Sequence, residues 1–146
     1  MSRILIALLL IASLAVAVSS AGVIGIPQTI LAQLTNLASS ITGQAFTVPA
    51  NLSVCAQQKV QIMIASFNDL VEDIVEDLPN EITLANLPNW ISQEMAEINN
   101  ATAFIDPTCF LTVADQFAIS TFMTFATGII TTLSFILASV IGLLVG

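Results

Sequence analysis

The chain begins and ends with long apolar runs, and between them apolar and polar positions recur with helical spacing. Residues 27–41 place apolar side chains at steps of three and four, which is the period of one face of an α-helix. Pro27 suits the first turn of this helix, and Gly43 suits its end. Residues 43–52 contain Gly, Pro and Asn, and we expect them to form a connection.

The clearest helix is predicted for residues 53–78, with Ser53 as its N-cap and Pro79 just beyond its end. An apolar stripe runs along one side of this helix. Five carboxylates are expected on the opposite side: Asp69, Glu72, Asp73, Glu76 and Asp77. Such runs are usually solvated helix faces, and this one lacks the glycine and alternating oxygen ligands of a calcium loop. The alternative interpretation is a docking site for a basic partner or a weak calcium site.

A third helix is predicted for residues 88–99, with Trp90, Ile91, Met95 and Ile98 facing inward. Residues 81–87 are ambiguous. No stretch shows strand-like alternation beyond a few residues, and no internal repeat is visible. The pattern therefore predicts an all-α fold, a small bundle of about three amphipathic helices.

The N-terminus has the features of a secretory signal peptide. Arg3 supplies a positive charge, residues 4–14 are almost entirely apolar, and small residues follow up to Ala21. The apolar run is short for a membrane span, which needs about 20 residues. We expect cleavage after Ala21, so residues 1–21 would be absent from the mature protein.

Two further features agree with export. Asn51 and Asn100 each begin an Asn-X-Ser/Thr glycosylation signal. The two cysteines, Cys55 and Cys109, allow a single intramolecular disulfide, which an oxidising compartment favours. Such a bond would contribute roughly 4 kcal/mol in the chain-entropy model. An intermolecular bridge, or lipidation of Cys109, are the alternatives.

The last part of the chain, residues 116–146, carries no charge. A helix over residues 118–146 would be about 43 Å long, more than the roughly 30 Å of a bilayer core. Three interpretations remain open: a signal for glycolipid attachment, a retained transmembrane helix, or a helix buried in a soluble or self-assembling protein. Small residues spaced by four indicate a possible helix–helix contact in lipid: Ser134, Ala138 and Gly142.

Composition narrows the function further. The chain has 2 basic and 10 acidic residues, and no His or Tyr, among 146. Nucleic-acid binding requires clustered Lys or Arg, so we exclude it. Without His, the usual Ser-His, Cys-His and zinc sites are absent. We therefore expect no enzyme, no catalytic residue, no metal and no cofactor.

These patterns predict three parts: a signal peptide (1–21), an acidic helical extracellular domain (22–115) and a hydrophobic C-terminal helix (116–146) that is a membrane anchor or a lipid-anchor signal. The expected function is that of a membrane-anchored cell-surface glycoprotein in recognition, adhesion or surface coating. Its partners would be the lipid membrane, and further copies of itself or another extracellular protein. The alternative is a secreted carrier of apolar ligands, or a self-assembling structural protein with the C-terminal helix buried.

Overall fold

A computed structural model of the chain describes residues 25–78, 82–103 and 105–145, so the predicted signal peptide lies outside the described residues. The described chain is helical and contains no strand, which confirms the predicted fold class. The elements are α2 (Gln28–Gln44), α3 (Val54–Asp77), α4 (Leu87–Thr102), the short 3-10 helix η1 (Pro107–Phe110) and α5 (Val113–Val145).

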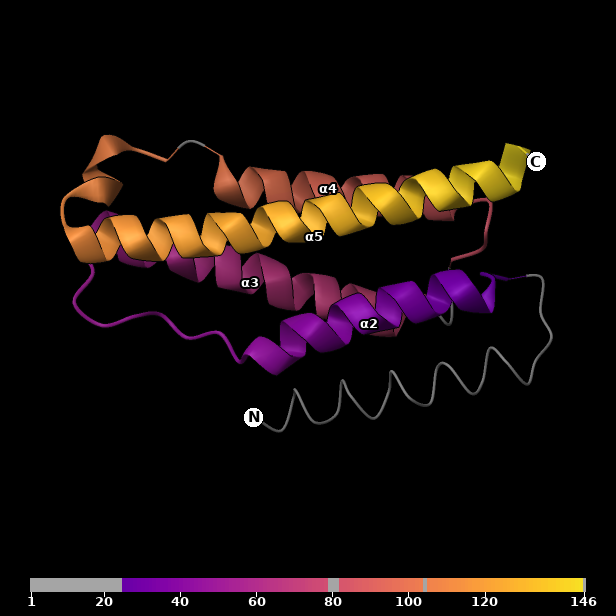
Figure 1. Ribbon diagram of the computed structural model, residues 1–146, viewed down its shortest axis with the longest axis horizontal. Helices are drawn as coiled ribbons and strands as arrows, with labels where there is room; N and C mark the ends of the chain where they lie inside the picture. Colours follow the sequence, from indigo (N-terminus) through magenta and orange to yellow (C-terminus); the bar gives the residue numbers. More distant parts are fainter. Residues whose placement is uncertain (1–24, 79–81, 104, 146) are drawn as a thin grey trace.

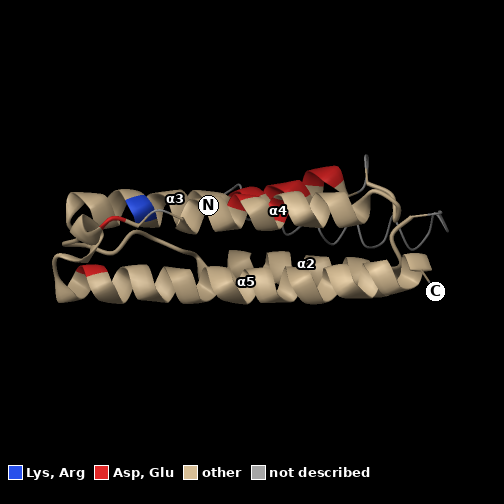
Figure 2. Cartoon of the chain, turned by 90° about the horizontal axis from the view of Figure 1, so that it is seen from above, with Lys and Arg blue, Asp and Glu red and all other residues tan. Residues whose placement is uncertain are grey.

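The four long helices form a bundle in which each runs antiparallel to the one before it (Figure 1). They make two layers, one of α2 and α5 and the other of α3 and α4 (Figure 2). Helix α5 has 33 residues and a length of about 50 Å, so it runs along the whole bundle. The expected long apolar C-terminal helix is therefore also the fourth helix of the bundle.

Helix α2 continues past the glycine at which we expected it to end. Gly43 lies inside the helix, and a Cβ atom there would meet nothing within 4 Å. The chain turns at Ala45, whose φ of 49° is left-handed and whose N–H bonds to the Thr42 carbonyl at 3.2 Å. The next residue, Phe46, packs against Phe67 and Phe125 with ring centroids 5.4 and 4.7 Å away. This packing fixes the turn two residues later than a glycine stop would.

The core is one apolar cluster to which all four long helices contribute. Helix α5 contributes a stripe at steps of four and three residues, which we call the inner seam: Asp115, Ile119, Phe122, Ala126, Ile129, Leu133, Ile136 and Val140. All its members are buried. One side of the C-terminal helix is thus sheltered by protein from Asp115 to Val140.

Candidate functional site

The opposite side of α5 is exposed. We call it the outer seam: Phe117, Thr121, Thr124, Gly128, Thr131, Phe135, Ala138 and Gly142. Each member follows an inner-seam residue by two positions, which places it about 200° around the helix. Phe117 and Phe135 are 74% and 67% exposed, and both are large apolar side chains. Helix α5 is the one described helix long and apolar enough to cross a membrane, with a mean hydropathy of 2.4.

Four hydroxyl groups of α5 bond to the backbone of the helix itself. Thr121 donates to the Phe117 carbonyl at 2.8 Å, and Thr132 donates to the Gly128 carbonyl at 2.9 Å. Thr127 and Ser139 make the same bond to the carbonyl four residues earlier. These hydroxyls can lose water at low cost because they keep a partner. The exposed side of α5 is therefore less polar than its Thr content implies.

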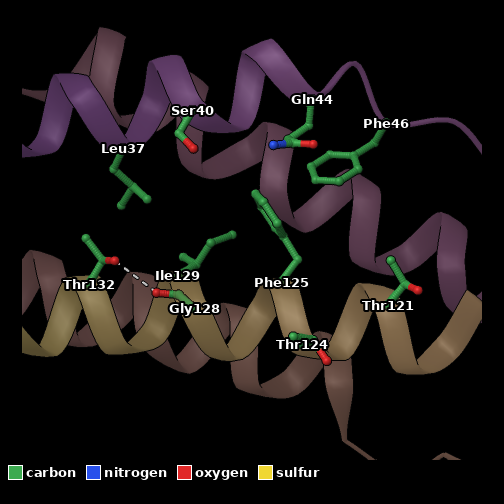
Figure 3. Close-up of a pocket in the computed structure, with 10 residues that line it drawn as sticks. All are labelled: Leu37, Ser40, Gln44, Phe46, Thr121, Thr124, Phe125, Gly128, Ile129 and Thr132. Carbon is green, nitrogen blue, oxygen red and sulfur yellow. Dashed lines mark hydrogen bonds between the residues drawn. The ribbon is translucent and has the colours of Figure 1, made fainter.

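An open groove of about 430 Å³ lies between α2 and α5. Leu37 and Ser40 of α2 face Phe125 and Ile129 of α5 across it (Figure 3). A smaller hollow of about 340 Å³ continues toward Phe135. No charged side chain lines either space: the residues are Gln33, Asn36, Leu37, Ser40, Gln44, Phe46, Thr121, Thr124, Phe125, Gly128, Ile129, Thr132, Phe135 and Ile136. The groove can accept only neutral or apolar groups without an uncompensated charge.

The predicted small-residue contact lies on the exposed half of α5. Ala138 and Gly142 belong to the outer seam, and no atom lies within 4 Å of a Cβ built at Gly142. Ser134 is exposed and its hydroxyl lies 4.0 Å from the Met95 sulfur of α4. A helix–helix contact through these three residues stays a prediction, since it requires a second molecule.

The acidic residues of α3 do not form a purely solvated side. Asp73 is half-buried and hydrogen-bonded to the buried carboxyl of Glu94 on α4. Burial raises the pKa of Glu94 to about 10, and the Asp73 carboxylate adds to the effect. Burial also raises the pKa values of Asp73 and Glu97, with repulsion from nearby carboxylates adding to both. At neutral pH, Glu94 is therefore a protonated acid that donates a hydrogen bond to Asp73.

Two overlapping groups of carboxylates bring their oxygens within 4.8 Å of one another and could hold a cation: Asp69, Asp73 and Glu97, and Asp73, Asp77 and Glu94. The second group is better explained by its hydrogen bonds. Asp77 accepts a bond of 3.1 Å from the indole N–H of Trp90, while Glu94 holds a proton. Glu94 is only 4% exposed, which leaves little access for a substrate. Trp90, Ile91 and Ile98 are buried as predicted, and Met95 is partly buried against the core.

A covalent link and a set of hydrogen bonds hold the end of the bundle where α3 and α5 begin. The sulfur atoms of Cys55 and Cys109 lie at bonding distance and their Cα atoms are 4.7 Å apart, which confirms the predicted pairing. Ser53 is at the predicted N-cap position, but its side chain makes no cap bond in α3. Its hydroxyl donates to the buried Asp115 carboxylate instead. Its backbone N–H donates to the same carboxylate at 2.9 Å. We call this region the disulfide end.

Both predicted glycosylation asparagines are exposed. Asn51 lies in the connection between α2 and α3 and has a φ of 66°, a left-handed conformation that Asn tolerates well. Asn100 lies in the last turn of α4. Their exposure is compatible with modification, and their use stays a prediction.

Sequence reasoning missed two buried carboxyls, although the helical period contained the signal. Glu94 falls on the stripe that Trp90 and Ile98 define at steps of four, and Asp115 begins the inner seam of α5. The groove between α2 and α5 left no such signal, because it depends on how the two helices diverge. Comparison of the chain with protein-family models, with curated proteins and with solved structures finds no match.

Proposed function

We propose that the protein is a secreted, non-catalytic glycoprotein of the cell surface, held at the membrane through α5, and that it acts in recognition, adhesion or coating of that surface. The observation that carries the proposal is the outward side of α5. It combines exposed large apolar residues with a threonine, Thr121, whose hydroxyl already has a backbone partner, and residues 116–146 carry no charge. Such a surface is costly to leave in water.

Exposed apolar side chains gather toward the end of α5. Four residues there are each at least 45% exposed: Ile141, Leu143, Leu144 and Val145. Fully burying one such side chain contributes about 1.5–3 kcal/mol. The last turns of α5, together with Phe117 and Phe135, therefore provide enough apolar surface for attachment to lipid. Exposed sequons and the disulfide support the extracellular part of the proposal.

Flotation with phosphatidylcholine vesicles tests the attachment. We expect the secreted wild-type protein to float with the vesicles and to enter the detergent phase in a detergent phase separation. Leu144→Asp should lower the bound fraction at least about tenfold, because it adds a charge where lipid contact is expected. Asn68→Asp, an equal change of charge at an exposed position of α3, is the matched control and should leave binding unchanged.

A wild-type protein that stays wholly in the aqueous phase would contradict membrane attachment. Mass analysis of the mature C-terminus then identifies the mode of attachment. Loss of residues 129–146 together with release by a phosphatidylinositol-specific lipase would indicate a lipid anchor, and an intact C-terminus a retained helix.

A second candidate function is favoured by the inner seam and by the groove beside it. Because one side of α5 packs in the core, the protein could instead be a soluble carrier of apolar ligands or a self-assembling structural protein. A monodisperse particle obtained without detergent, with no binding to vesicles, would favour this function over the first.

A further inference from the structure

The layer formed by α2 and α5 lacks charge on its outer side. Helix α2 contains no charged residue, and the single one in α5, Asp115, is buried (Figure 2). The carboxylates of α3 and α4 lie on the other layer. One face of this acidic protein is therefore uncharged, with two exposed phenylalanines on it.

The outer seam has nearly the same pattern when it is followed in either direction. From Phe117 to Phe135 its members are spaced by four, three, four, three and four residues. A large aromatic residue stands at each end, and Thr or Gly stands at each position between them. The alternation of three and four is the spacing at which two helices pack side by side with a small crossing angle.

We propose that a second copy of the chain covers this seam, in a dimer with antiparallel α5 helices whose twofold axis passes at the level of Ala126. With this axis Phe117 lies against the partner's Phe135, and Thr124 lies against the partner's Gly128. Thr121 lies against the partner's Thr131. The interface is isologous, since each patch meets its own copy. Small residues at the centre let the two backbones approach, and the aromatic rings close both ends.

The size of the face agrees with a second copy. Two α5 helices in this register overlap over about 40 Å, and the layer of two helices is about 20 Å wide. The product is about 800 Å² for each partner, the size of a standard stable interface. Aromatic residues are enriched and charged residues depleted in the centres of such interfaces.

Charge also favours this face. The chain has a net charge of −8, so two copies repel each other wherever their acidic layers meet. Pairing through the uncharged layer places the two α3–α4 layers on opposite outer sides of the dimer. No carboxylate then needs to be desolvated at the interface.

The inference does not rest on the proposed function. Chains that cross a membrane share one orientation, so an antiparallel pair belongs to the water-soluble bundle. The second copy and a bilayer would compete for the same side of α5.

The mass of the secreted, enzymatically deglycosylated protein in detergent-free buffer tests the dimer, measured by light scattering during size exclusion. We expect twice the chain mass. Thr124→Glu should weaken association at least about tenfold, because it places two carboxylates beside the axis. Gln58→Glu on exposed α3 is the matched control and should stay dimeric. Circular dichroism would verify that both variants remain helical.

Cysteine variants and a short bismaleimide test the register. Two copies of Thr124→Cys lie about 6 Å apart along the axis and should cross-link, whereas two copies of Phe117→Cys lie about 27 Å apart and should not. A mixture of Phe117→Cys and Phe135→Cys should cross-link. Self-linking of Phe117→Cys as efficient as that of Thr124→Cys would overturn the antiparallel arrangement.

A monomer at every concentration would overturn the dimer, and its binding to vesicles would leave the proposed function standing. A dimer that does not bind vesicles would support the inference and contradict membrane attachment. The two ideas can therefore fail separately.

Discussion

The two layers of the bundle bury similar apolar stripes but treat their outer sides differently. The α3–α4 layer carries a group of carboxyl groups, and one of them, that of Glu94, is buried and keeps its proton. In the α2–α5 layer the outer side has no charge, and four hydroxyls of α5 bond to the backbone of their own helix. The first layer is suited to face water, and the second is suited to be covered. The contrast shows that hydropathy alone does not distinguish a core helix from a membrane helix when one helix has both kinds of side.

The largest expected change in the free energy of unfolding distinguishes the buried side of α5 from its exposed side. Leu133→Ala removes a fully buried inner-seam side chain and should lower the free energy of unfolding by about 3 kcal/mol. Thr127→Ala, at an exposed position of the same helix, should change it by no more than about 0.5 kcal/mol. Chemical denaturation followed by circular dichroism measures both. Small and equal effects would show that α5 does not belong to the folded bundle.

A smaller effect concerns pH and the α3–α4 layer. The folded state keeps the Glu94 proton up to about pH 10, whereas an ordinary Glu with a pKa of 4.5 loses it in the unfolded state. The stabilisation is thus complete below about pH 4.5 and declines as the pH rises toward 10. We expect unfolding at about pH 8 to cost roughly 2 kcal/mol less than at about pH 5, about half of the full linkage because of solvent screening.

Glu94→Gln tests this assignment, because the amide keeps a donor for Asp73 and cannot titrate. Denaturation curves at several pH values should show that the dependence largely disappears in this variant. Glu76→Gln, at an exposed position of the same layer, should retain it. An unchanged pH dependence in Glu94→Gln would remove the buried proton from the explanation.

The smallest effect concerns the α2–α5 layer. Gly43 is helical, and an added Cβ atom meets nothing within 4 Å, so Gly43→Ala should raise the free energy of unfolding by about 0.5–1 kcal/mol. Ala32→Gly, at an exposed position of the same helix, should lower it by a similar amount. Thermal denaturation ranks the two. A destabilising Gly43→Ala would mean that the end of α2 needs glycine after all.

The helices were predictable because their apolar residues keep one period, as on α3 from Val60 to Val75. The ends of the helices were less predictable. Helix α2 continues past Gly43 because a tertiary contact, the packing of the Phe46 ring on Phe67, sets the position of the turn. The cysteine pairing followed from a count of two. Ser53 was correctly placed as a helix start, but its hydrogen-bond partner, Asp115, lies 62 residues away and no local rule identifies it.

The candidate site was predictable only in part for a similar reason. The helical period indicates which α5 residues share a side, and the hydropathy of the sequence already distinguishes this helix from the other three. Which side another helix covers depends on how four helices pack, as the exposure of Phe135 beside the buried Ile136 shows.

The connection that carries Asn51 and the last turn of α4 that carries Asn100 lie at the same end of the bundle, the disulfide end (Figure 1). The last turn of α5 lies at the other end. If both asparagines carry glycans, the branched sugar chains form a hydrated layer over the disulfide end. If the final turns of α5 alone, without Phe117, contact the membrane, this glycan layer faces away from it, and a protease or a neighbouring cell contacts carbohydrate before protein.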